Sequence, residues 1–181
     1  KFLSNIKEVN AIAEVVRIFE DTDVIHVDGK IDPVHDIEVI NLELILSDLQ
    51  IVEKRIGTAE KDAKRGDKTT AKEIEILEKI KKVLLEGKLA QTADILLEDK
   101  ELIKGLMLLT LKPIMYVLNK KSPPSQGSGV ASGNLDEIKN GQCEERWVKL
   151  MEFIKNSGSM YVIVDAGLEN ELKENIPALM A

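Results

Sequence analysis

Three short apolar runs along the chain predict buried β-strands. They span residues 13–19, 114–118 and 160–164, are rich in Val, Ile or aromatic residues, and lack strict alternation of apolar and polar positions. Strands of a parallel sheet read as continuous apolar runs because helices cover both faces of the sheet. The three runs therefore predict an α/β fold with a parallel sheet.

The stretch between the second and third runs predicts a βαβ crossover. Residues 144–156 place apolar side chains on one helical face at three- and four-residue spacing, and Gly158 then ends the helix. These side chains belong to Trp147, Leu150, Met151 and Ile154. The preceding residues 120–141 are rich in Pro, Gly and Ser, which is typical of a mobile or disordered linker.

The stretch between the first and second runs predicts a long helix. Asp32 and Pro33 form a helix start, with an acidic N-cap and a proline in the first turn. Apolar residues then recur in an a/d heptad pattern that extends the helix to Arg65, over about 50 Å. The heptad positions are Leu42, Ile45, Leu49, Val52, Ile56, Ala59 and Ala63.

A second helix follows and completes an antiparallel hairpin. Residues 66–67 break the first helix, Thr70 and Glu73 match a capping box, and Gly87 ends the second helix. A short loop between two long amphipathic helices favours packing within the chain. A third helix, at about 98–108, leads back to the sheet.

These elements predict one α/β domain in two parts, residues 1–36 and 109–181, with a helical coiled-coil insertion at 37–108. The net charge of −7 disfavours a general nucleic-acid binder or a reader of DNA sequence. The single cysteine, Cys143, excludes an internal disulfide and fits a reducing compartment. Without a signal peptide or an apolar run near 18 residues, we expect a cytoplasmic protein that spans no membrane.

Polar residues end the apolar runs and mark a candidate ligand site. Asn119 follows the second run and Asp165 the third, and ligands of open α/β sheets bind beyond the carboxyl ends of the strands. The alternatives are that Asn119 caps a turn, that Asp165 starts the next turn, and that Lys120 and Lys121 are a solvated pair.

The two histidines tempt a metal-site interpretation. His26 and His35 flank Asp28, Asp32 and Asp36, but these residues lack a fixed ligand spacing. A structural role is the favoured interpretation, so the sequence predicts no metal site and no catalytic residue.

Four segments resemble the YchF/Obg-like ATPase family. They are residues 2–21 (FLSNIKEVNAIAEVVRIFED), 24–44 (VIHVDGKIDPVHDIEVINLEL), 61–68 (KDAKRGDK) and 108–119 (LLTLKPIMYVLN). The resemblance implies a Ras-like P-loop nucleotidase with a coiled-coil insertion and a carboxyl-terminal TGS domain. It implies a parent protein that hydrolyses ATP or GTP with Mg²⁺ and acts as a ribosome-associated or stress-linked switch.

The resemblance also implies that this chain holds the base side of the nucleotide pocket without the phosphate side. The sequence contains no GxxxxGK[ST] motif, so we expect that motif before Lys1 and the TGS domain after Ala181. Both ends are then cuts in a longer protein, and the chain alone is expected to be inactive.

The base-recognition residues follow from the same resemblance. GTPases read guanine with NKxD and the family resembled here has NxxE, whereas this sequence has Asn119 followed by Lys120, Lys121 and Ser122. Ser122 matches neither acid, so the choice between ATP and GTP stays open. The expected nucleotide-binding residues are Asn119, Lys120, Lys121, Asp165, Ala166 and Gly167.

The hairpin supports two other hypotheses. Its predicted tip is basic, which favours an interaction module that binds the ribosome or another RNA–protein partner. The basic residues are Lys61, Lys64, Arg65 and Lys68. Alternatively, the heptad pattern forms a scaffold or dimerisation arm.

Overall fold

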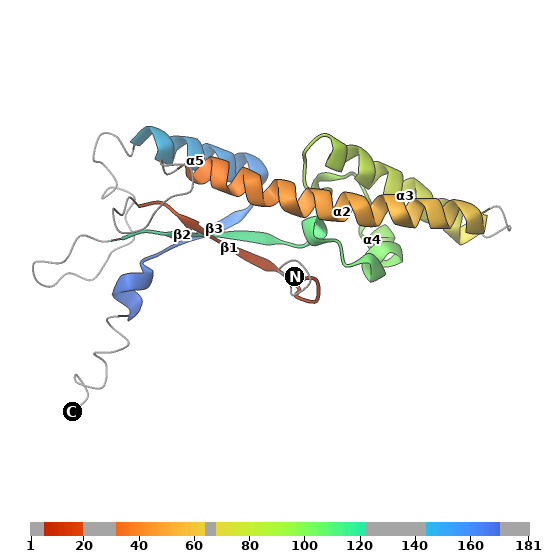
Figure 1. The fold of residues 1–181 in the computed structure, drawn as a ribbon, viewed down its shortest axis with the longest axis horizontal. Coiled ribbons are helices and arrows are strands. Elements are labelled where there is room, and N and C mark those ends of the chain that lie inside the picture. The colour runs from red at the N-terminus through yellow and green to blue at the C-terminus, as the bar shows by residue number, and fades with distance from the viewer. Residues whose placement is uncertain (1–5, 20–31, 64–67, 122–143, 171–181) are drawn as a thin grey trace, which may run out of the picture. The chain divides into compact units, whose positions relative to one another are not determined.

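The computed structural model describes residues 6–19, 32–63, 68–121 and 144–170 (Figure 1). Its contacts divide the chain into two compact units. One comprises residues 1–12 and 38–113, and the other comprises residues 13–37 and 114–181. The predicted linker at 120–141 lies outside the described residues from Ser122 onward, and so does Cys143.

The second unit is built on a three-stranded sheet in the order β1-β2-β3, with β1 at Ile12–Arg17, β2 at Ile114–Asn119 and β3 at Met160–Val164. Strands β2 and β3 are parallel, with Met115 beside Met160 and Asn119 beside Val164. Strand β1 bonds to the chain of β2 at both ends, from Ile12 N to the Pro113 oxygen (2.9 Å) and from Ile18 N to the Asn119 oxygen (3.0 Å). In both bonds the same number of residues separates the donor from the acceptor, so β1 runs parallel to β2. All three strands therefore run in one direction. The predicted α/β fold is confirmed.

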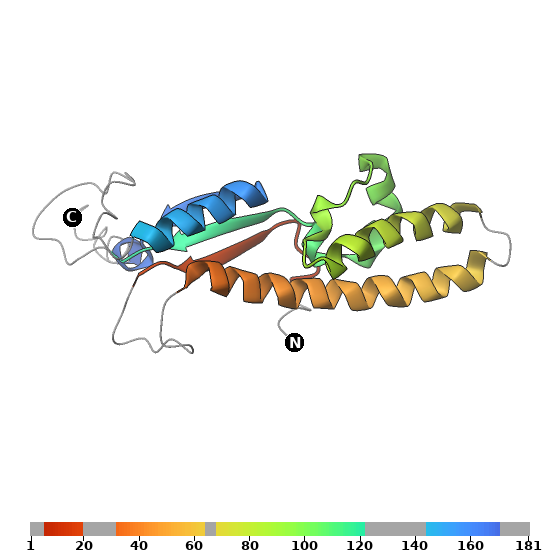
Figure 2. The ribbon, with the colours of Figure 1, turned by 90° about the horizontal axis from the view of Figure 1, so that it is seen from above.

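Helix α5, Glu144–Ser157, connects β2 to β3 and lies along them (Figure 2). Leu150 and Ile154 are buried, and Phe153 places its ring 6.3 Å from that of Tyr116 on β2. The helix ends at Gly158, which has a φ of 66° and donates its N–H to the Lys155 oxygen. The βαβ crossover is confirmed, and its helix is one residue longer than predicted.

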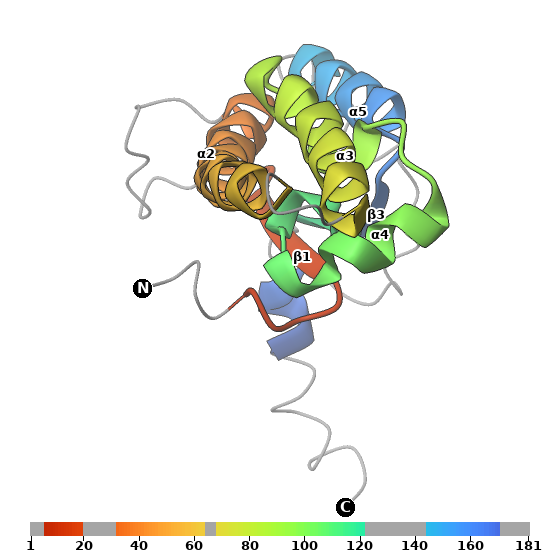
Figure 3. The same ribbon diagram turned by 90° about the vertical axis from the view of Figure 1, so that its right-hand side faces the viewer.

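The first unit contains most of one long helix and the whole of a second, which lie side by side and run in opposite directions (Figures 1 and 3). Helix α2 spans Pro33–Ala63 and α3 spans Lys68–Leu85. Arg55 of α2 donates two hydrogen bonds of 2.6 Å to Glu73 of α3, and Lys81 lies 3.4 Å from Glu53. Apolar residues from both helices are buried, among them Val52, Ile56, Ala59, Ile76, Leu77 and Ile80.

The ends of these helices test the predicted caps. The Asp32 carboxylate accepts the His35 N–H at 3.1 Å, which confirms the predicted N-cap. The capping box is wrong, because α3 begins at Lys68 and already contains Thr70, while Glu73 is engaged with Arg55. At the other end, Gly87 has a φ of 73° and terminates α3 as predicted.

The heptad pattern predicted only part of the buried face of α2. Ile45, Val52, Ile56 and Ala59 are buried, but Leu42 is 52% exposed, and Leu44 and Asp48 are buried in its place. A helix with 3.6 residues per turn drifts by about 20° per heptad against a strict 3.5-residue repeat. The buried face therefore shifts along the helix.

Short elements lead from α3 back to the sheet. They are a 3₁₀ turn at Ala90–Thr92, helix α4 at Leu97–Ile103, and two further 3₁₀ turns at Lys104–Leu106 and Leu109–Leu111. Helix α4 ends earlier than predicted because the chain passes into a 3₁₀ turn and then into a left-handed residue, Met107, with a φ of 50°. Within the described residues, no helix combines the length and apolar character needed to cross a membrane.

Candidate functional site

The residues that follow β2 and β3 meet at one edge of the sheet. Asn119 lies beside Val164 in the parallel register, and the next residue, Lys120, donates its N–H to the Val164 oxygen at 2.8 Å. Both strands thus deliver their carboxyl ends to the same place, which is where ligands bind in open α/β sheets.

The side chain of Asn119 joins the end of β2 to the segment that follows β3. Its Oδ1 accepts a hydrogen bond of 3.1 Å from the N–H of Ala166, the second residue after β3. Because a backbone N–H can only donate, this bond assigns the orientation of the amide and leaves its Nδ2 as a group with two donors. Asn119 is therefore a positioned hydrogen-bond donor.

Asp165 is held by the chain that follows it. It is only 8% exposed, its Oδ1 accepts the Leu168 N–H at 3.0 Å, and its carbonyl accepts the Glu169 N–H at 3.0 Å. Asp165 thus caps a helical stretch at 166–170, the turn-starting role that the sequence left open. A contact between its carboxylate and a ligand stays a prediction.

The structure places the other expected site residues at the same edge. Ala166 and Gly167 are exposed in the first turn after β3, and Lys121 is exposed after β2, whereas Lys120 is half-buried. A Cβ added at Gly167 would lie 3.5 Å from the Asp165 Oδ1, an ordinary contact, so close packing does not require glycine here. Of the six expected residues, Asn119, Lys120 and Ala166 are joined across the two strand ends by register or hydrogen bonds. The other three are their neighbours along the chain: Lys121, Asp165 and Gly167.

Within the described part of the chain, no group of three His, Cys, Asp or Glu side chains is arranged to hold a metal ion. His35 is exposed, and Asp32 caps α2. His26 and Asp28 lie outside the described residues.

Sequence reasoning missed Glu14, which lies within β1 between apolar neighbours. Burial raises the pKa of its carboxyl to about 7, and its Oε2 has no hydrogen-bond partner among the described residues. The bonds that join β1 to β2 place Glu14 beside Tyr116, on the face of the sheet that α5 covers. An acid inside an otherwise apolar strand was the available signal.

Comparison with known proteins gives a consistent result. The chain is 41% identical to the Ribosome-binding ATPase YchF of Bacillus subtilis over 174 residues, which is 96% of this chain and 44% of that protein. The chain belongs to the YchF/Obg-like family. It is also 41% identical to Obg-like ATPase 1 of Saccharomyces cerevisiae over 123 residues, 65% of this chain and 31% of that protein.

A solved structure of this family has the same fold. The Schizosaccharomyces pombe YchF GTPase superposes with a TM-score of 0.75 at 29% identity, over 96% of this chain and 44% of that chain. No family model matches the sequence. The chain thus spans less than half the length of the YchF relatives that it matches.

Proposed function

We propose that this chain supplies the base-binding side of a nucleotide pocket in a cytoplasmic YchF/Obg-like protein that hydrolyses ATP or GTP. The observation that carries the proposal is the hydrogen bond from Ala166 N–H to Asn119 Oδ1. It fixes a polar side chain between the ends of two parallel strands, where the nucleotide base would lie.

The geometry of Asn119 bears on which base is read. Its oxygen is already occupied, so the amide offers N–H donors to the ligand. Adenine and guanine both carry a ring-nitrogen acceptor at N7, so a donor of this kind accepts either purine. We therefore assign purine recognition to Asn119, and discrimination between ATP and GTP to residues elsewhere in the pocket.

Hydrolysis needs groups that position the phosphates and Mg²⁺, and the sequence lacks the GxxxxGK[ST] motif that supplies them. The six residues proposed here contact the base side only. The chain alone is therefore expected to bind nucleotides weakly and not to turn them over.

Helices α2 and α3 provide the second part of the proposal. We assign them to the coiled-coil insertion of the nucleotide domain and propose that they contact the ribosome. The names of the relatives support a ribosome partner, and the exposed Lys61 near the end of α2 supports an acidic surface on that partner.

Nucleotide binding is tested with fluorescent ATP and GTP analogues titrated into the 181-residue chain. Asn119→Ala should weaken binding of both analogues by about tenfold, the worth of one or two hydrogen bonds. Asn156→Ala, the same change at an exposed position at the end of α5, should leave affinity unchanged. Equal affinities for the two variants would mean that the nucleotide does not bind at this edge of the sheet.

Ribosome binding is tested by co-sedimentation at several salt concentrations. Reversal of Lys61, Lys64 and Lys68 to Glu should abolish a salt-sensitive association. An association that persists in the triple variant would place the contact away from the hairpin.

A further inference from the structure

Strand β3 is an edge strand of the sheet formed by the described residues, with β2 on one side only. Its sequence, Met-Tyr-Val-Ile-Val, contains none of the charges or prolines by which proteins usually protect such edges. Met160, Tyr161 and Val162 are 68, 39 and 40% exposed. An apolar, unprotected edge of this kind favours pairing with another strand.

The backbone groups that face this open edge can be assigned. Val164 directs its carbonyl toward β2, because that oxygen accepts the Lys120 N–H. Alternate residues of a strand direct their backbone groups to opposite sides, so Tyr161 and Ile163 present theirs to the open edge.

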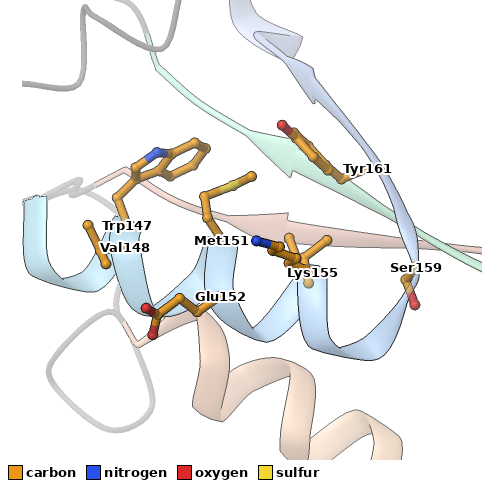
Figure 4. Close-up of a pocket in the computed structure, with 8 residues that line it drawn as sticks. Trp147, Val148, Met151, Glu152, Lys155, Ser159 and Tyr161 are labelled. Atoms are coloured by element: carbon orange, nitrogen blue, oxygen red, sulfur yellow. The ribbon is translucent and has the colours of Figure 1, made fainter.

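An apolar pocket of about 550 Å³ lies beside the edge (Figure 4). Helix α5 contributes Trp147, Met151 and Lys155, which recur every four residues on one side of the helix, and β3 contributes Tyr161. The pocket and the strand edge form one continuous surface, because Tyr161 belongs to both.

We propose that this surface is a two-fold interface between two copies of the chain, in which β3 pairs antiparallel with β3 of the second copy around Val162. In this register Tyr161 of one copy lies opposite Ile163 of the other. These are the two residues whose backbone groups face the open edge, so both pairs exchange their hydrogen bonds. The surface is then self-complementary, as a two-fold contact requires.

The charged residues beside the pocket also fit a two-fold axis through Val162. From Met160 to Val162 the strand rises about 7 Å, which corresponds to about four or five residues of α5 counted back from Ser157. The axis through Val162 is therefore level with Glu152 or Phe153 of α5. Glu152 and Lys155 lie on either side of that level, and both line the pocket.

Two α5 helices related by this axis run antiparallel, so Glu152 of each copy lies within one helical turn, measured along the helices, of Lys155 of the other. Each copy brings one acid and one base, and the interface gains two opposite-charge pairs. This complementarity favours a second copy of this chain over an unrelated apolar segment as the occupant.

Sedimentation velocity over a range of concentrations tests the proposal, with light scattering to give the mass. The wild-type chain should form a dimer. Glu152→Lys and Lys155→Glu should each weaken dimerisation by about tenfold, because each change creates two like-charge pairs. The double variant, with the charges exchanged, should restore the wild-type dissociation constant.

Two control variants separate this interface from non-specific association. Glu145→Lys makes the same charge change on α5 outside the pocket, at a residue paired with Lys149 at 2.8 Å, and should leave dimerisation unchanged. Val15→Lys changes a residue of β1 that is as exposed as Met160, at 68%, and should also have no effect. A monomer at every concentration, a particle larger than a dimer, or a double variant as weak as the single variants would overturn the proposal.

Discussion

The carboxylate of Asp48 in α2 accepts hydrogen bonds from both the backbone N–H and the hydroxyl of Thr110, at 2.7 and 2.6 Å. Both residues are completely buried. The other carboxylate oxygen accepts the Leu109 N–H at 2.9 Å, and the Thr110 hydroxyl oxygen accepts the Ala90 N–H at 3.2 Å. Asp48 thus bonds α2 to the turn at Leu109–Leu111, and Thr110 bonds that turn to the one at Ala90–Thr92.

Asp48→Ala is expected to lower the free energy of unfolding by about 3 kcal/mol, because it leaves buried N–H groups without an acceptor. Asp48→Asn keeps one acceptor oxygen and should lose less. Chemical denaturation followed by circular dichroism measures both values. A loss below about 1 kcal/mol in Asp48→Ala would mean that water or another group replaces the carboxylate.

Local sequence signals predicted the helices and strands but not the hydrogen bonds between Asp48 and Thr110. The strands and α5 were predicted because their apolar runs and the glycine after α5 act within a few residues. Asp48 and Thr110 are 62 positions apart, and nothing near either residue identifies the other. Likewise, Thr70 and Glu73 matched a capping box, but Glu73 bonds Arg55, 18 positions away.

The candidate site, like the fold, could be predicted from the sequence only in part. The rule that ligands bind at strand ends brought Asn119 and Asp165 to one edge, and the parallel register bears this out. The bond from Ala166 to Asn119 depends on the path of the turn after β3, and the capping role of Asp165 depends on the helical stretch that follows. Spacing along the sequence encodes neither.

Glu14 makes the stability of the fold depend on pH. Its pKa is raised to about 7 from 4.5 by burial, so the native state retains a proton that the unfolded chain has already lost above pH 4.5. The native state is therefore progressively penalised between pH 4.5 and 7, and the full penalty applies above pH 7. Lower pH removes the penalty.

Glu14→Gln should remove this dependence, because the amide does not titrate. At pH 8 the variant should exceed the wild type in free energy of unfolding by about 1–2 kcal/mol, after allowance for partial solvent exposure of the carboxyl. At pH 4.5 the two should be nearly equal. Urea denaturation at both pH values measures the difference, and a difference independent of pH would show that packing, not ionisation, separates the variants.

Two glycines should respond in opposite directions to the same substitution. Gly57 lies inside α2 and Gly87 follows α3 with a φ of 73°, and a Cβ would meet nothing within 4 Å at either position. Gly57→Ala should stabilise by about 0.5–1 kcal/mol, because alanine has the higher helix propensity. Gly87→Ala should destabilise by about 1 kcal/mol, because the left-handed backbone strains an L side chain.

Thermal unfolding of the two alanine variants compares these effects, because both variants carry the same replacement of glycine by alanine. A variant that carries both substitutions should return close to the wild-type midpoint, since the two sites lie in different elements. Stabilisation by Gly87→Ala would contradict the left-handed conformation after α3.

The pair Arg55–Glu73 should contribute more than the exposed ion pairs of the same helices. Arg55 donates from Nε and from an Nη to the two carboxylate oxygens, and the side chain of Glu73 is only 13% exposed. Bonding to Glu73 raises the pKa of Arg55, which remains charged at every accessible pH. A double-mutant cycle with alanine should give a coupling of about 1 kcal/mol.

The matched cycle uses Lys79 and Glu75 of α3, which are 3.0 Å apart but 48 and 67% exposed. Its coupling should be about 0.3 kcal/mol and should vanish in 1 M salt, because water and ions screen the pair. Arg55→Lys should lose most of the Arg55–Glu73 coupling, since lysine cannot form the two-pronged contact. Couplings of equal size in the two cycles would mean that Arg55 and Glu73 do not hold α2 against α3.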